Sequence, residues 1–104
     1  MPREILPNRR QVRRLTFKVG SLVYTGTLGY YDDGRLGEVF LHCGLSGTDA
    51  NTVARDSAFA VSFALQHGCT AETIRSAFTR DATGSPEGPL GILFDMLVQE
   101  STAE

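Results

Sequence analysis

The sequence predicts a two-layer α+β domain, in which a three-stranded antiparallel sheet is covered on one face by a long helix with two shorter helices beside it. Two observations predict this order of elements (β-β-β-α-α-α). Apolar and polar residues alternate up to about residue 43, and an alanine-rich segment with helical periodicity starts near residue 51. A chain of 104 residues has room for one domain with a modest core. We expect that domain at residues 14–99, between a basic arm at 1–13 and a polar tail at 100–104.

Three segments have the pattern of strands joined by tight turns. Residues 14–19 alternate in polarity, and Gly20-Ser21 is a hairpin turn with glycine first. Residues 22–31 form a second strand rich in Thr, Tyr and Val, and a turn at 32–35 leads to a third strand at 38–43. The residues expected to face the helix layer are Leu15, Phe17, Val19, Val39, Leu41 and Cys43.

Two glycines interrupt the second strand. Gly26 and Gly29 offer no side chain for packing, and a glycine within a strand indicates a bulge or a place where another backbone comes close. We therefore expect one of these features near the middle of the sheet.

The long helix, expected over residues 51–68, has two different faces at 3.6 residues per turn. One face is apolar and contains small side chains such as Ala54 and Ala58, which allow the helix axis to lie close to a sheet. The other face is polar except for Phe59 and Phe63, which are four residues apart and need a cover. That cover could be the C-terminal helix or a second copy of the chain. The polar face also contains Asn51, Thr52, Arg55, Asp56, Ser62, Gln66 and His67.

Two shorter helices follow the long one. Gly68 should end the long helix, and Thr70 should cap a short helix that extends to about residue 78. The last helix, at about 90–99, is apolar nearly all round, so it must be covered on more than one side. Part of this cover could come from a second subunit, and we predict a homodimer. The candidate interface residues are Phe59, Phe63, Arg55, Leu93, Phe94 and Leu97.

The loop before the long helix, GLSGTD at residues 44–49, is a helix start signal. Ser46, Thr48 or Asp49 could cap the free N–H groups, and Ser46 with Asp49 fits a capping box. A glycine loop at a helix N-terminus can also hold a phosphate, although Asp49 would repel it and no lysine follows as in a P-loop. The candidate anion-binding residues are Gly44, Ser46, Gly47 and Thr48.

The composition is that of an ordinary soluble domain, with a net charge of −2 and 21% charged residues. No apolar run is long enough to span a membrane and no signal peptide is visible, so we expect a cytoplasmic protein. Cys43 and Cys69 are far apart, and His42 and His67 lack partners at metal-ligand spacing. We find no catalytic constellation, and we expect neither a cofactor nor a metal.

The N-terminal arm concentrates positive charge in Arg3, Arg9, Arg10, Arg13 and Arg14. Such an arm could bind nucleic acid or an acidic partner, or it could be a solvated leader without a specific role. No aromatic residue is interleaved in it, so we favour the solvated leader.

Several segments together resemble a known family. They are GEVFL at 37–41, GLSGTDA at 44–50, ALQHG at 64–68, TAETI at 70–74 and SPE at 85–87. On these segments the chain resembles the TSCPD domain, a small module at the C-terminus of adenosylcobalamin-dependent ribonucleotide reductases that also occurs as short stand-alone proteins.

The resemblance implies a link to deoxyribonucleotide synthesis rather than nucleotide reduction by this chain. The family has a cysteine before the proline of its naming motif, where this sequence has Ser85. The catalytic barrel and the C-terminal cysteine pair of such reductases have no counterpart here. We therefore expect a non-catalytic accessory or interaction module, with a ribonucleotide reductase as a possible partner. The alternatives are a nucleic-acid-binding protein that uses the arginine arm and a small protein that binds a nucleotide or phosphate.

Overall fold

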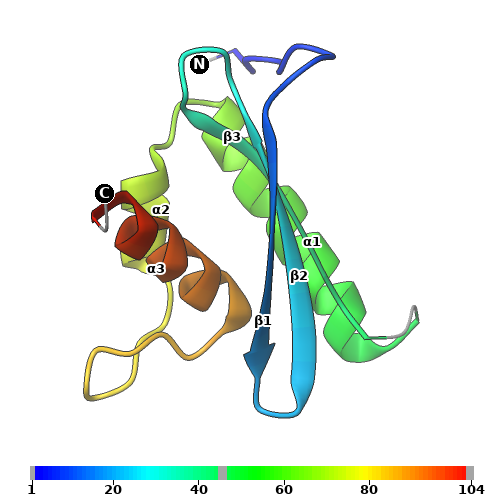
Figure 1. Ribbon diagram of the computed structural model, residues 1–104, viewed down its shortest axis with the longest axis vertical. Coiled ribbons are helices and arrows are strands. Elements are labelled where there is room, and N and C mark those ends of the chain that lie inside the picture. The colour runs from blue at the N-terminus through cyan, green and yellow to red at the C-terminus, as the bar shows by residue number, and fades with distance from the viewer. Residues whose placement is uncertain (1, 45–46, 103–104) are drawn as a thin grey trace.

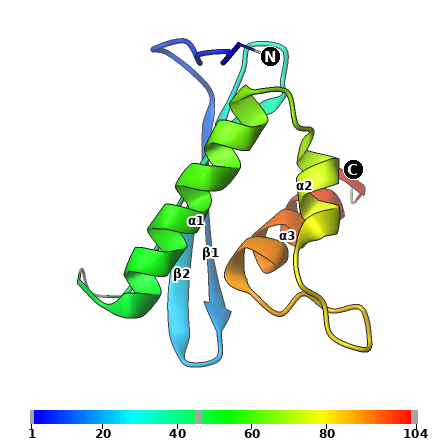
Figure 2. The same ribbon diagram turned by 180° about the vertical axis from the view of Figure 1, so that it is seen from behind.

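The computed structural model describes residues 2–44 and 47–102 and confirms the predicted α+β class. The strands form one antiparallel sheet in the order β1-β2-β3. The elements are β1 (Val12–Val19), β2 (Leu22–Tyr30), β3 (Leu36–Cys43), α1 (Asp49–Gln66), α2 (Ala71–Ala77) and α3 (Pro89–Thr102). Figure 1 shows α2 and α3 to one side of the strands, and Figure 2 shows α1 running along the back of the molecule.

The local signals in the sequence specify the turns and helix ends. Val19 pairs with Leu22, so Gly20-Ser21 is the two-residue hairpin turn that was expected, and Gly20 has a φ of 61°. Thr70 accepts a hydrogen bond from the backbone N–H of Thr73 and caps α2. At the end of α1, Gly68 has a φ of 101°, a value that glycine adopts without steric cost. The predicted stop after α1 is therefore confirmed.

The bounds of several elements differ from expectation. β1 begins at Val12 and β3 at Leu36, each two residues earlier than the alternation indicated. The N-cap of α1 is Thr48, so this helix starts at Asp49. α3 continues to Thr102, so the residues expected to form a polar tail include the last turn of a helix.

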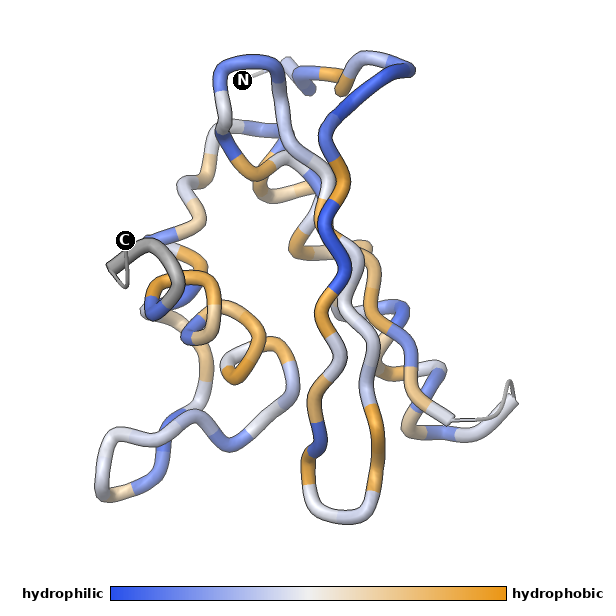
Figure 3. The backbone as a smooth tube through the Cα atoms, in the orientation of Figure 1, coloured by the Kyte–Doolittle hydropathy of each residue, from blue (hydrophilic) through white to orange (hydrophobic). Residues whose placement is uncertain are grey.

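One face of the sheet forms the core together with α1 and α3. Leu28 pairs with Val39 and Tyr24 pairs with Cys43, which places these side chains on the same face. Figure 3 shows that α3 is hydrophobic along most of its described length. The buried core consists of Tyr24, Leu28, Val39, Leu41, Cys43, Ala54, Ala58, Leu65, Leu90, Leu93 and Phe94.

Gly26 permits α3 to approach the sheet closely. A Cβ atom at this position would lie 2.8 Å from Cδ2 of Leu93, too near for two carbon atoms. A close approach is present here, but a side chain fills the space rather than the backbone that was expected. The second glycine lies at an irregularity, because the pairing between β2 and β3 shifts register between Gly29 and Tyr30. The pairing skips Gly37 of β3, so the irregularity lies in the strand opposite Gly29 rather than in β2.

The long helix lies along the outer edge of β3 rather than across the middle of the sheet. Ser62 accepts a hydrogen bond from the backbone N–H of Val39 at 2.8 Å and donates one to its carbonyl oxygen at 2.9 Å. The Asn51 side chain accepts from the backbone N–H of Cys43 at 3.1 Å. These backbone groups belong to the edge of β3 that does not pair with β2, so side chains of α1 replace a missing strand.

This placement rotates α1 relative to the expected faces. Ala54, Ala58 and Leu65 are buried as predicted. However, Asn51 and Ser62 were assigned to the polar outer face and are buried, while Val53 was assigned to the apolar inner face and is 64% exposed. Gln66 is also buried, and its side chain donates to the carbonyl oxygen of Gly37 at 3.0 Å. The assignment was wrong at these positions because the edge of a strand selects hydrogen-bonding side chains.

Candidate interaction surface

Among the described residues, no group of three or more His, Cys, Asp and Glu side chains could hold a metal ion. Both cysteines are free thiols. Cys43 is buried in the core, and Cys69 is exposed. Tyr24 lies beside Cys43, and burial followed by the hydrogen bond with this thiol raises the pKa of the phenol. A raised pKa keeps the Tyr24 phenol protonated near neutral pH.

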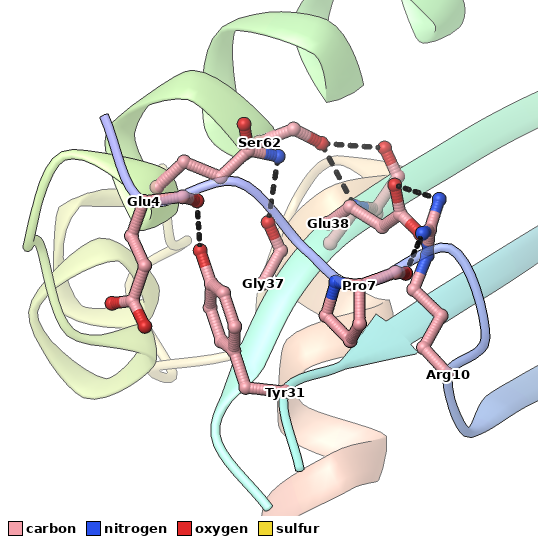
Figure 4. A network of polar contacts seen from close by, with 9 residues as sticks. Glu4, Pro7, Arg10, Tyr31, Gly37, Glu38 and Ser62 are labelled. Carbon is pink, nitrogen blue, oxygen red and sulfur yellow. Dashed lines mark hydrogen bonds and ion pairs between the residues drawn. The ribbon is translucent and has the colours of Figure 1, made fainter. Parts of the chain in front are cut away.

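The N-terminal segment packs against the sheet and the end of α1. Leu6 is buried, and a Cβ atom at Gly37 would lie only 2.8 Å from its Cδ2 atom, so Leu6 packs directly over this glycine. The backbone N–H of Glu4 donates to the carbonyl oxygen of Gln66 at 2.7 Å, and the Tyr31 hydroxyl donates to the carbonyl oxygen of Glu4 at 2.5 Å (Figure 4). The expectation of a solvated leader is therefore wrong for these residues. Backbone contacts between segments far apart in sequence hold the segment in place.

Two of the arginines of this segment are bound within the chain. Arg10 forms an ion pair with the largely buried Glu38, with 2.5 Å between Nε and Oε2 (Figure 4). Arg3 donates from Nε to the side-chain oxygen of Gln66 at 2.6 Å, and its guanidinium lies 5.0 Å from the centre of the Phe63 ring. These contacts occupy groups that a nucleic-acid-binding arm would direct toward phosphates.

Three phenylalanines form an exposed strip where α1 meets β3, which we call the aromatic strip (Phe40, Phe59 and Phe63). They are 42%, 41% and 50% exposed. The rings of Phe40 and Phe59 meet edge to face, with 6.4 Å between their centres. A groove of about 400 Å³ begins beside this pair and is lined by Phe40, Leu41, His42, Gly44, Asn51, Arg55 and Phe59.

The aromatic strip borders the face of the sheet that lies opposite the core. On this face Val23 is 45% exposed, and α2 and α3 lie on the other side of the strands (Figure 1). The C-terminal helix therefore does not cover Phe59 and Phe63, and that alternative is wrong. A cluster of exposed aromatic rings beside an uncovered sheet face is typical of a surface that binds another protein.

The structure separates the predicted interface residues into two sets. Phe59, Phe63 and Arg55 are exposed on α1, as an interface requires. Leu93 and Phe94 are 0% and 2% exposed, because they lie in the core of their own chain. This placement contradicts a role for Leu93 and Phe94 at an interface. Leu97 is partly buried against the same core.

The cover of α3 comes from its own chain. The ring of Phe94 packs edge to face on Phe78, with 5.3 Å between the ring centres. A Cβ atom at Gly91 would lie 2.8 Å from Cβ of Pro86, so the preceding loop also closes on the helix. The need for cover around α3 was predicted from its sequence, but α2 and the loop supply it without a second subunit.

Asp95 joins α3 to the two segments before it. Its carboxylate accepts from Nη1 and Nη2 of Arg80 at 3.0 and 2.7 Å and from Nε of Arg75 at 2.8 Å. Hydrogen bonding from Arg80, together with that from Arg75, lowers the pKa of Asp95 to about 2 against the desolvation that opposes it. In the sequence Asp95 is an acidic exception in a helix that is otherwise apolar nearly all round. That exception was the available signal, because a lone acid in such a helix needs a cationic partner.

The candidate anion loop is described only in part. Thr48 is the N-cap of α1, and its hydroxyl accepts from the backbone N–H of Asn51 at 3.3 Å. Gly44 and Gly47 have φ values of 57° and 85°, which suit glycine. Ser46 lies outside the described residues. The described part of the loop therefore shows the capping interaction expected at the start of a helix.

Comparison with known proteins links the chain to one enzyme. The chain is 38% identical over 89 residues to a vitamin B12-dependent ribonucleotide reductase from Bradyrhizobium diazoefficiens, covering 85% of this chain and 7% of that protein. It is 40% identical over 78 residues to the enzyme of the same name from Agrobacterium fabrum, covering 74% of this chain and 6% of that protein.

The chain is similar to a short segment of vitamin B12-dependent ribonucleotide reductases. It spans only 6% to 7% of the length of these relatives, so it corresponds to a small part of each enzyme. No family model matches the chain, and no solved structure matches it significantly. Within the part of the chain that the structure describes, no helix is long and apolar enough to cross a membrane.

Proposed function

We propose that this chain is a non-catalytic interaction module of the TSCPD type, associated with deoxyribonucleotide synthesis in the cytoplasm. The similarity to a segment of vitamin B12-dependent ribonucleotide reductases supports the association. The aromatic strip is the observation that carries the proposal of an interaction module, because three exposed rings lie together on one surface.

The proposed primary partner of the aromatic strip is a second copy of the chain. Phe59 and Phe63 lie one turn apart on α1, so two antiparallel copies of this helix could interleave their rings about a twofold axis. Arg55 lies one turn before Phe59 and would flank such a contact. Aromatic and arginine side chains are also the types most enriched at the centre of protein interfaces.

Sedimentation equilibrium of the purified chain tests the dimer. A chain of 11.3 kDa should sediment with twice this mass, and Phe59→Asp or Phe63→Asp should return it to the mass of one chain. Val53→Asp is the matched control, since Val53 is an exposed apolar residue on the same helix outside the aromatic strip. A single-chain mass for the unmodified protein would refute the dimer.

The link to the reductase needs a separate measurement. Immobilised protein should retain a vitamin B12-dependent ribonucleotide reductase from the same cell, and Phe63→Asp should reduce this retention while Val53→Asp should not. Each variant should keep the circular dichroism spectrum of the unmodified chain, because both sites are exposed. Equal retention by all three proteins would show that the aromatic strip has no part in the contact.

A further inference from the structure

The two edge strands of the sheet differ in whether their outer backbone groups have hydrogen-bond partners. Side chains of α1 satisfy the outer edge of β3, where Ser62 bonds Val39 and Asn51 bonds Cys43. β1 is the opposite edge, and within the described part of the chain it pairs only with β2. Figure 1 shows β1 at the front of the molecule with no helix or strand before it. One edge of this sheet is therefore closed and the other is open.

The open edge has the regularity that strand addition requires. β1 contains eight residues, VRRLTFKV, without proline or glycine, and its pairing with β2 shows no register shift. Its outer N–H and C=O groups can accept another strand. On the core side, Leu15 and Phe17 are only partly buried although they contact the core. An added strand would cover more of these two side chains.

The charge on β1 selects the kind of strand that fits. Arg14 and Lys18 are exposed on the face opposite the core, and the strand carries no acidic residue. Their neighbours on β2 are Thr27 and Val23, which are neutral. Opposite charges on directly paired residues stabilise a sheet, so acidic residues on a new strand would meet the positive charges that β2 leaves without a cross-strand partner.

The same charges disfavour a second copy of β1 as the added strand. In the antiparallel register that pairs residues 13–19 of two copies and keeps their core faces on the same side, Arg14 would lie opposite Lys18 at two places in the ladder. Like charges directly opposite one another destabilise a pair of strands. The open edge is therefore better matched to a different chain segment than to itself.

We propose that the outer edge of β1 binds an extended acidic peptide segment as a fourth strand. Residues of the bound strand would alternate. Acidic side chains would lie on the face of Arg14 and Lys18, and apolar side chains between them would lie beside Leu15 and Phe17. β1 and β3 are opposite edges of the sheet, and the aromatic strip lies at the β3 edge, so strand addition at β1 does not use the aromatic strip.

An NMR titration of the full chain tests the proposal. The probe is an eight-residue peptide of alternating valine and glutamate, and the matched control has lysine in place of glutamate. The glutamate peptide should shift the amide resonances of β1 in a saturable way, and added salt should weaken it. The lysine peptide should leave these resonances unchanged.

Two further arms separate strand addition from simple charge attraction. The double variant R14E/K18E should weaken binding of the glutamate peptide by about tenfold or more and bind the lysine peptide instead, since the cross-strand pairs are reversed. A glutamate peptide methylated at alternate backbone nitrogens loses donors of the ladder and should not bind. R14Q/K18Q, which only neutralises the charges, should fall between the unmodified chain and R14E/K18E.

Four results would overturn the proposal. They are an absence of shifts in β1 with the glutamate peptide, equal binding of both peptides, full binding of the methylated peptide, and shifts of β1 that depend on protein concentration without any peptide. The last result would identify a second copy as the occupant. Dispersed spectra of each variant establish folding, because both substituted residues are exposed and outside the core.

Discussion

Ser62 makes the pair of hydrogen bonds that attaches the middle of α1 to the edge of β3, and Ser62→Ala tests whether these bonds hold the helix there. The hydroxyl accepts from the backbone N–H of Val39 at 2.8 Å and donates to the carbonyl oxygen of the same residue at 2.9 Å. Ser62 is buried, so water cannot readily replace the lost partner. The substitution therefore leaves one donor and one acceptor of Val39 without this partner.

The expected loss follows from these two bonds. Each contributes about 1 kcal/mol to the free energy of unfolding, so their removal costs about 2 kcal/mol. Alanine has a higher helix propensity than serine, which returns about 0.5 kcal/mol. The expected net loss is about 1.5 kcal/mol, which corresponds to a fall of about 6 °C in the melting temperature for a domain of this size.

Urea denaturation followed by circular dichroism measures this change. Ser57→Ala is the matched control, because Ser57 lies on the same helix and its hydroxyl donates to the carbonyl oxygen of Val53 within that helix. Its free energy of unfolding should change by no more than about 0.5 kcal/mol. If the two variants lose equal stability, the side-chain closure of the β3 edge does not contribute as the geometry indicates.

The remaining predictions concern α3. Gly26→Ala should lower the free energy of unfolding by about 1–3 kcal/mol in urea denaturation, because its Cβ would lie 2.8 Å from Leu93, whereas Gly88→Ala places its Cβ in open space and should have little effect. Asp95 has a pKa of about 2 in the folded chain and 3.8 as the ordinary value, so its contribution is present above pH 4 and is lost as the pH falls toward 2. Asp95→Asn should cost up to about 2 kcal/mol at pH 7, less what solvent screening removes, and the unfolding curves of variant and unmodified chain should converge near pH 2. A constant difference between these curves at all pH values would show that the ion pair with Arg80 is not its source.

The type and order of the elements could be read from local patterns because the interactions that create them are local. Alternation along β1 and β2, glycine at the hairpin turn, Thr70 before α2 and Gly68 after α1 all act within a few residues of the chain. The close approach at Gly26 was also predictable, although the residue that fills the space, Leu93, lies far along the sequence.

The candidate interface could be predicted only in part, because the neighbours of a side chain come from segments that are distant in sequence. Phe59 and Phe63 are conspicuous on a polar helix face, and they are exposed as the pattern indicated. Leu93 and Phe94 belong to a helix that is apolar on all sides, and its sequence does not say which neighbour covers each side. Phe40 alternates with Val39 and Leu41 along β3 and so points away from the core, but its contact with Phe59 depends on where α1 lies.

The amino-acid pattern alone determined that three strands precede three helices, because side-chain period, turn chemistry and caps are properties of consecutive residues. Only the folded chain decided which polar residues of α1 would be buried, since Asn51, Ser62 and Gln66 become favourable in the interior once the unpaired edge of β3 lies beside them. It also decided that Arg10 would pair with Glu38 rather than remain in solvent. In both cases the partner is distant in sequence, and a polar residue carries no local mark of the group that will satisfy it.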